Sequence, residues 1–144
     1  MDSELMILPM FAMVTLTFII GVIMRLRRDK VVREGFNWRY YKTFEGDRPP
    51  RESLQVDQHF VNLFEVPILF YVACLSSLYI SESLDKVTFV FAWIYFLGRV
   101  VHARICLTNN RLLWRARVYV FSGLILYSMW IWIVYIVIKS TMGT

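Results

Sequence analysis

Residues that bind metals or form disulfides are scarce in this sequence. Its 144 residues include two cysteines and two histidines, and no HExxH or CxxC motif occurs. A zinc or iron site needs three or four such ligands at fixed spacing. The sequence therefore predicts no bound metal and no haem. Neither an internal repeat nor a low-complexity tract is present.

Long polar stretches are also missing, because 58% of the residues are hydrophobic. Crossing a hydrocarbon core of about 30 Å takes about 20 helical residues. Four apolar segments are long enough, near Leu5–Met24, His59–Ile80, Val87–Leu107 and Val118–Ile138. Backbone groups in lipid must bond within their own segment, which favours helices. We predict that residues 1–144 form one all-α domain, an integral membrane four-helix bundle without a soluble domain.

The sequence predicts neither a structural disulfide nor a signal peptide. Cys74 is expected in the middle of the bilayer and Cys106 near one face, so no structural disulfide is predicted. The first segment does not resemble a signal peptide. Its apolar run is too long, its leading residues are acidic and its arginines follow the run.

Positive charge is concentrated in two places. Nine of the 16 Lys and Arg residues lie between Arg25 and Arg51. Four more accompany the end of the third segment: Arg104, Arg111, Arg115 and Arg117. Basic residues collect on the cytoplasmic side of membrane proteins. We therefore predict cytoplasmic first and third connections with both termini outside, and we do not attribute the net charge of +5 to nucleic acid binding.

The first connection is expected to be a long cytoplasmic loop from Arg25 to about Val56. Loops of this length are usually functional or disordered. Its aromatic residues, which include Trp38, Tyr40 and Tyr41, argue against disorder and predict docking at the membrane interface.

Polar residues follow one face of the second segment and one face of the third. The first set, spaced by three or four residues, is Gln55, Gln58, His59, Asn62 and Glu65. The second set is Tyr95, Arg99, His102 and Cys106. Ionisable residues inside a bilayer usually face a partner or a wet cavity. The sequence thus predicts a polar cleft between these two helices.

Several of these residues admit more than one role. Glu65 and Arg99 are expected at similar depth, where they would form an ion pair that locks two helices together, lines a site, or does both. Cys106 follows His102 by four residues, a spacing that a cysteine nucleophile and its base could share. Arg111, Arg115 and Arg117 either extend to lipid headgroups, or one of them points into the cleft and binds an anion or stabilises a thiolate.

The stretches Phe60–Val72, Arg99–Ala103 and Asn110–Arg111 resemble the MAPEG family, the membrane-associated proteins in eicosanoid and glutathione metabolism. The resemblance is greatest to its small bacterial branch. It implies a homotrimer, in a bacterial inner membrane, that binds glutathione between subunits towards the cytoplasm. Asn62 and Glu65 match positions that hold glutathione, Arg99 matches a helix-three arginine, and His102 falls where some members have tyrosine. Arg111 or Arg115 would stand near the arginine that forms the thiolate.

One position departs from the catalytic pattern. Catalytic members carry an arginine where this sequence has Gln58, and neither Gln55 nor His59 replaces its fixed charge. The leading hypothesis is a glutathione or other thiol transferase or peroxidase that uses glutathione as cosubstrate and acts on lipophilic electrophiles. The alternative is a non-catalytic subunit that binds lipid, as the five-lipoxygenase-activating protein does, or that scaffolds a larger membrane complex. A transporter is a third and weaker hypothesis.

Overall fold

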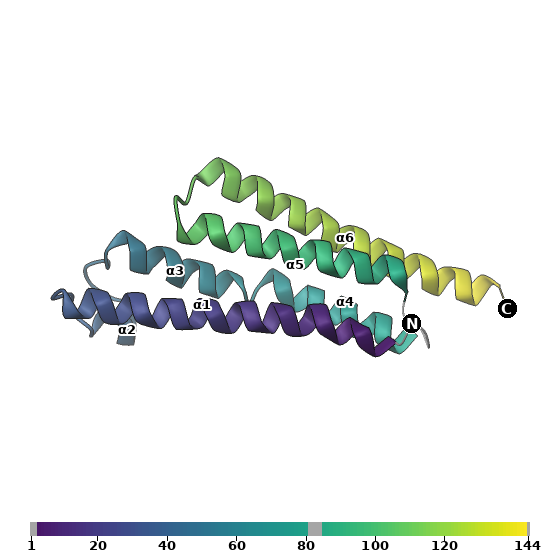
Figure 1. Ribbon diagram of the computed structural model, residues 1–144, viewed down its shortest axis with the longest axis horizontal. Helices are drawn as coiled ribbons and strands as arrows, with labels where there is room; N and C mark the ends of the chain where they lie inside the picture. The colour runs from purple at the N-terminus through teal and green to yellow at the C-terminus, as the bar shows by residue number, and fades with distance from the viewer. Residues whose placement is uncertain (1–2, 81–84, 144) are drawn as a thin grey trace.

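The computed structural model describes residues 3–80 and 85–143, and within them every regular element is a helix. The elements in chain order are η1 (Ser3–Met6), α1 (Ile7–Arg33), α2 (Tyr40–Thr43), α3 (Arg51–Asn62), α4 (Val66–Ile80), α5 (Lys86–Leu107) and α6 (Leu112–Met142). Helices α3 and α4 follow one another along the same direction, so the long helices form four rods that lie side by side (Figure 1).

Four helical spans of the described chain are long and apolar enough to cross a membrane: Glu4–Arg33, Arg51–Ile80, Lys86–Leu107 and Leu112–Met142. Large apolar side chains on their outer faces are exposed, among them Phe11 and Phe18 of α1 and Leu124 of α6. In a membrane these faces meet lipid. The predicted all-α, four-helix membrane fold is therefore confirmed, and the chain is a multi-pass integral membrane protein.

The inside of the bundle is packed with methionine, aromatic and small side chains. Met13, Phe70, Tyr95 and Met129 are fully buried. The rings of Phe70 and Tyr95 are stacked with their centroids 4.8 Å apart. Helices α5 and α6 approach closely where a Cβ added to Gly98 would lie 3.0 Å from the Cβ of Ser122. Small residues at such crossings let membrane helices pack without a hydrophobic driving force.

The first connection is shorter than predicted, because α1 continues to Arg33 and α3 already begins at Arg51. Glycine and proline are absent from the extended part of α1, and the Arg25–Asp29 ion pair at 3.0 Å supports it. Gly35, with φ of 101°, ends the helix in the left-handed conformation that helix C-termini favour. Helix α6 similarly begins at Leu112, before the apolar run that starts at Val118.

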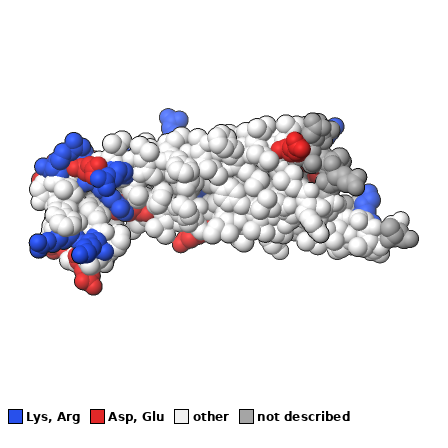
Figure 2. All heavy atoms as spheres, turned by 90° about the horizontal axis from the view of Figure 1, so that it is seen from below, with Lys and Arg blue, Asp and Glu red and all other residues white. Residues whose placement is uncertain are grey.

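The basic residues gather at the end of the bundle where α2 lies (Figure 2). Arg27 ties this end together by donating to the carbonyl oxygens of Glu52 and Leu107, at 3.0 and 2.8 Å. Arg28 pairs with Asp57 at 2.9 Å. The charges of the first connection thus dock α1 against α3 and against the end of α5.

The second span is not one helix, as the sequence was expected to form, but two. Residues Leu63, Phe64 and Glu65 form a turn between α3 and α4. Pro67 explains the break, because its ring excludes the carbonyl of the residue four positions earlier and it lacks an N–H. The amide groups of Leu63 and Phe64 bond instead to carbonyls three residues back, at 3.1 and 2.9 Å.

Candidate functional site

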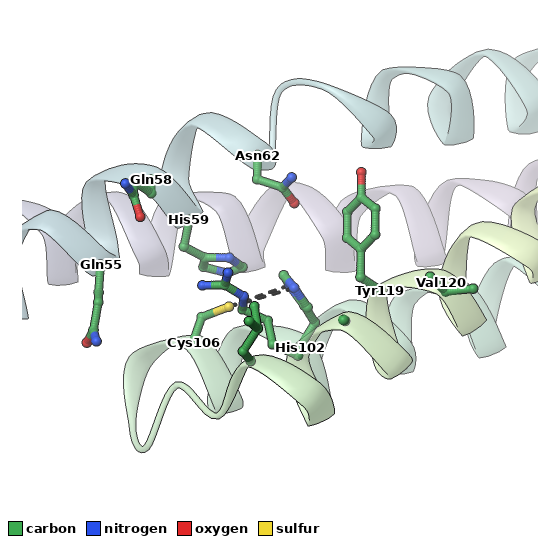
Figure 3. A pocket seen from close by; sticks show the side chains of 11 residues that line it. Gln55, Gln58, His59, Asn62, His102, Cys106, Tyr119 and Val120 are labelled. Carbon is green, nitrogen blue, oxygen red and sulfur yellow. Dashed lines mark hydrogen bonds between the residues drawn. The ribbon is translucent and has the colours of Figure 1, made fainter.

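A cavity of about 350 Å³ lies between α3, α5 and α6, towards the basic end of the bundle (Figure 3). Helix α3 contributes Gln55, Gln58, His59 and Asn62, helix α5 contributes His102 and Cys106, and helix α6 contributes Leu112, Arg115, Ala116, Tyr119 and Val120. The polar faces of the second and third spans thus meet as the spacing predicted. Of the wall that α6 supplies, Arg115 was a predicted candidate. The other α6 residues were not predicted, because they show no polar stripe in the sequence.

Helical spacing explains how α3 presents several polar side chains to one cavity. Gln55, His59 and Asn62 recur at intervals of four and three residues, so they project from one side of the helix. His59 is buried, whereas Gln58 is exposed at the cavity margin. The amides can donate and accept hydrogen bonds, which suits a peptide-like ligand.

Asn62 connects the two charged residues that were expected to form an ion pair. Arg99 Nη2 donates to Asn62 Oδ1 at 2.6 Å, and Asn62 Nδ2 donates to Glu65 Oε2 at 3.2 Å. No direct ion pair between Glu65 and Arg99 occurs among the described residues. Glu65 lies in the turn that Pro67 creates and is exposed, so the break displaces it from the expected helical position. A pairing across two subunits stays a prediction.

Arg99 is fully buried and is not among the described residues that line the cavity. Its guanidinium carbon is 5.6 Å from the centre of the Tyr119 ring, a cation–π distance. Its Nε and Nη1 atoms find no hydrogen-bond partner in the part of the chain that the structure describes. Arg99 therefore acts on the cavity through its charge and through Asn62, which lines the cavity wall.

The two candidate arginines of the third connection differ in position. Arg115 lines the cavity, and its Nη1 donates to Asn110 Oδ1 at 2.9 Å. Asn110 has φ of 46°, a left-handed conformation that asparagine tolerates better than most residues. Arg111 precedes α6 and is exposed, and it is not among the residues of the described chain that line this cavity. The geometry thus separates two residues that the sequence left equivalent.

The structure also gathers a set of side chains that the sequence did not connect. His59 from α3 and His102 and Cys106 from α5 point towards one another at one side of the cavity (Figure 3). The scarcity of histidine and cysteine predicts no metal site, and the sequence spacing pairs Cys106 only with His102. The predicted cleft between the two polar faces is the sequence signal that could have connected His59 with His102 and Cys106.

Comparison with known proteins places the chain in a family. A model of the MAPEG family matches residues 6–135, which is nearly the whole chain. The chain belongs to the MAPEG family. No curated protein and no solved structure matches it. The resemblance seen in the sequence is therefore confirmed at the level of the family.

MAPEG membership extends over every residue that lines the cavity, from Gln55 to Val120. The family includes glutathione transferases and members with other roles, so membership establishes a lipid-contacting membrane protein and leaves its activity open. The activity must be argued from the cavity itself.

Proposed function

We propose that this MAPEG protein binds glutathione, or another thiol of similar size, in the α3–α5–α6 cavity and transfers it to lipophilic electrophiles. The observation that carries the proposal is Arg115. Arg115 belongs to the cavity lining, together with amide and imidazole side chains, and its guanidinium donates to Asn110 Oδ1 at 2.9 Å. A fixed positive charge next to a bound thiol favours the thiolate, which is the reacting form.

The chain's own residues divide the remaining work. Gln55, Gln58 and Asn62 offer amide groups to the peptide part of the thiol. The apolar side chains of Leu112 and Val120 line the α6 wall, where a hydrophobic electrophile enters from the bilayer. The thiolate sulfur forms a bond to the electrophilic atom, and the leaving group departs with the electron pair of the bond that breaks. With a lipid hydroperoxide the same thiolate would attack the terminal oxygen and break the O–O bond, which gives a sulfenic acid and, with one proton taken up, the lipid alcohol. A second thiol molecule would then convert the sulfenic acid into a disulfide and water.

Gln58 predicts weak thiol binding. It is neutral where catalytic family members carry an arginine, and Arg115 is the sole Lys or Arg in the cavity lining of the described chain. We therefore expect thiol binding to be about 10–150-fold weaker than it would be with an arginine at this position, since losing one charged hydrogen bond costs about 1.5–3 kcal/mol. The resemblance to the family further suggests a homotrimer in a bacterial inner membrane, with the cavity towards the cytoplasm.

A second candidate function is lipid binding without catalysis, and an apolar groove favours it. The groove, of about 540 Å³, runs between α1 and the α3–α4 break and is lined mostly by aliphatic and aromatic side chains, including Val14, Phe18, Phe60 and Phe64. Such a surface suits an acyl chain. In this case the polar cavity would hold the lipid headgroup or serve only to stabilise the bundle.

Arg115→Ala tests the thiol transferase proposal, with Arg111→Ala as its matched control. Removing Arg115 should raise the pKa of the bound thiol by about one unit, since one unit corresponds to about 1.4 kcal/mol. Turnover of an aromatic electrophile should fall about tenfold for the same reason. Ultraviolet thiolate absorbance with glutathione bound measures the first effect, and a conjugation assay measures the second.

Arg111→Ala should leave both signals nearly unchanged, because Arg111 lies outside the cavity. Equal losses in the two variants would indicate a general surface-charge effect. If the wild-type protein shows neither thiolate absorbance nor turnover at millimolar glutathione, transfer of this thiol is wrong. The lipid-binding function would then take first place.

A further inference from the structure

His59, His102 and Cys106 form a buried cluster that thiol transfer does not use. Their relative exposures are 3%, 4% and 4%, and their ligand atoms all lie within 4.8 Å of one another. The Sγ atom of Cys106 is 3.7 Å from Nε2 of His102. The centres of the two imidazole rings are 5.2 Å apart. Two helices thus bring three strong metal ligands to one point.

His59 is the member whose environment is incomplete. In the described chain neither its Nδ1 nor its Nε2 has a hydrogen-bond partner, although both atoms are buried. Leaving a buried polar group unsatisfied costs about 1–3 kcal/mol. An imidazole in this position would gain by binding a ligand between itself, His102 and Cys106. His102 and Cys106 alone, four residues apart on one helix, would not indicate a metal site.

The spacing of the cluster fits a three-coordinate metal ion. Metal–nitrogen bonds of about 2.0–2.1 Å and metal–sulfur bonds of about 2.3 Å place the ligand atoms about 3.5–3.8 Å from one another. The His102–Cys106 distance of 3.7 Å already meets this requirement. Since no pair exceeds 4.8 Å, His59 has to approach by no more than about 1.3 Å.

We propose that His59, His102 and Cys106 bind a single copper(I) ion. A cysteine thiolate selects soft metals such as Cu(I), and imidazole accepts copper as well. The net charge of the occupied site favours Cu(I) over Zn²⁺. Arg99 and Arg115 both act electrostatically on the two histidines. One thiolate neutralises Cu(I) completely, whereas Zn²⁺ would leave an additional positive charge beside the two arginines, at high cost in a membrane.

A glutamine side chain could supply a weak fourth ligand to the copper ion. Gln55 and Gln58 line the same cavity, and an amide oxygen is a known weak fourth ligand in His₂Cys copper sites. The copper site does not depend on the proposed thiol transfer, because it uses side chains at one edge of the cavity and requires no glutathione. Glutathione itself binds Cu(I), so it must be left out of the test.

The test is a Cu(I) titration of the full chain in detergent, in thiol-free buffer with ascorbate and bicinchoninate as the competing chelator. The wild type should bind one Cu(I) per chain. Removing a residue that is hydrogen-bonded to a metal ligand typically weakens metal binding about 10–100-fold. His59→Asn and Cys106→Ser remove ligands themselves, so each should weaken binding at least about 100-fold. Cys74→Ser is the matched control, because Cys74 is a buried cysteine on α4 outside the cluster, and it should bind as the wild type does.

X-ray absorption at the copper edge of the wild type keeps the proposal testable if a variant fails to fold. We expect one sulfur and two nitrogen neighbours. A spectrum without sulfur, or Cu(I) affinity unchanged in both ligand variants, would overturn the site. A parallel titration with Zn²⁺ separates the metals. Tighter retention of Zn²⁺ than of Cu(I) by these same ligands would overturn the copper assignment.

Discussion

Asn62 holds a buried charge in place between two helices. Asn62 accepts a hydrogen bond from the fully buried Arg99 at 2.6 Å, and its own amide group donates to the Glu65 carboxylate at 3.2 Å. An arginine in a membrane protein is costly unless it has partners. The neutral amide and the Tyr119 ring supply partners inside the bundle, while the carboxylate stays at the exposed turn.

Asn62→Ala should therefore destabilise the protein more than Glu65→Ala. Losing a hydrogen bond to a buried charge costs about 1.5–3 kcal/mol, whereas an exposed and indirect charge contributes about 0–1 kcal/mol. Reversible unfolding in mixed detergent micelles measures both free energies. The double variant Asn62→Ala with Arg99→Ala should cost less than the sum of the single changes, by about 0.5–3 kcal/mol. Additivity, or a larger loss in Glu65→Ala, would contradict this network.

At the scale of the helices, hydropathy and charge predicted most of the fold but little of its detail. The four apolar runs predicted the spans because crossing a membrane imposes a minimum length. The extension of α1 to Arg33 was hidden, because a helix can leave the bilayer without any change in backbone structure. Pro67 was visible, yet whether a proline kinks a helix or divides it depends on which groups accept the freed backbone bonds.

The sequence predicted part of the site and missed the rest. The three- and four-residue spacing on α3 placed Gln55, His59 and Asn62 in one cleft, because helical geometry fixes their direction. The choice of Arg115 over Arg111 depends on how the turn before α6 orients each side chain, and sequence spacing does not encode this. The cluster with Cys106 depends on the depth at which α3 and α5 cross.

The N-terminus of α5 carries the clearest pH-sensitive contact outside the membrane spans. Asp85 accepts from the backbone N–H of Thr88 at 2.9 Å, from the Thr88 hydroxyl, and from Trp132 Nε1 at 2.7 Å. Burial by itself raises the pKa of the Asp85 carboxyl, but these hydrogen bonds outweigh it and hold the pKa below its ordinary value of 3.8. The ionised carboxylate is thus the form that stabilises the fold.

Asp85→Ala should lower the free energy of unfolding by about 0.5–2 kcal/mol, the usual effect of losing a helix cap. Because the folded-state pKa is depressed, the stabilisation is complete above pH 3.8 and is lost as the pH falls through the lower folded-state value. Thermal unfolding midpoints of the wild type and the variant should therefore converge in acid. Asp47→Ala, at an exposed loop residue, is the control and should give parallel curves. If the difference in unfolding midpoint between the wild type and Asp85→Ala grew towards low pH, the ionised Asp85 carboxylate would not be the stabilising form.

For the whole molecule, the separation of charge along the bundle predicts which end faces the cytoplasm. Lys and Arg gather at the end where α2 lies (Figure 2). The cavity is lined by α3, by the last turns of α5 and by the first turns of α6, which lie towards the same end. The cytoplasmic side of a membrane retains basic segments. A cavity on that side would be supplied with cytoplasmic thiols and with lipophilic electrophiles from the bilayer, as the proposed function requires.

Single cysteines at the two ends of the bundle test this orientation. Glu45→Cys lies in the exposed connection between α2 and α3, and it avoids the strain at Gly46, whose φ is 99°. Met142→Cys lies at the opposite end of the bundle, where the residue is 82% exposed. In intact cells a membrane-impermeant maleimide should label Met142→Cys and spare Glu45→Cys, and permeabilised cells should label both. The wild type measures the background from Cys74 and Cys106, which are buried. Labelling of Glu45→Cys in intact cells would show that the predicted topology is wrong. The cavity, with Arg115, would then lie on the outer side of the membrane.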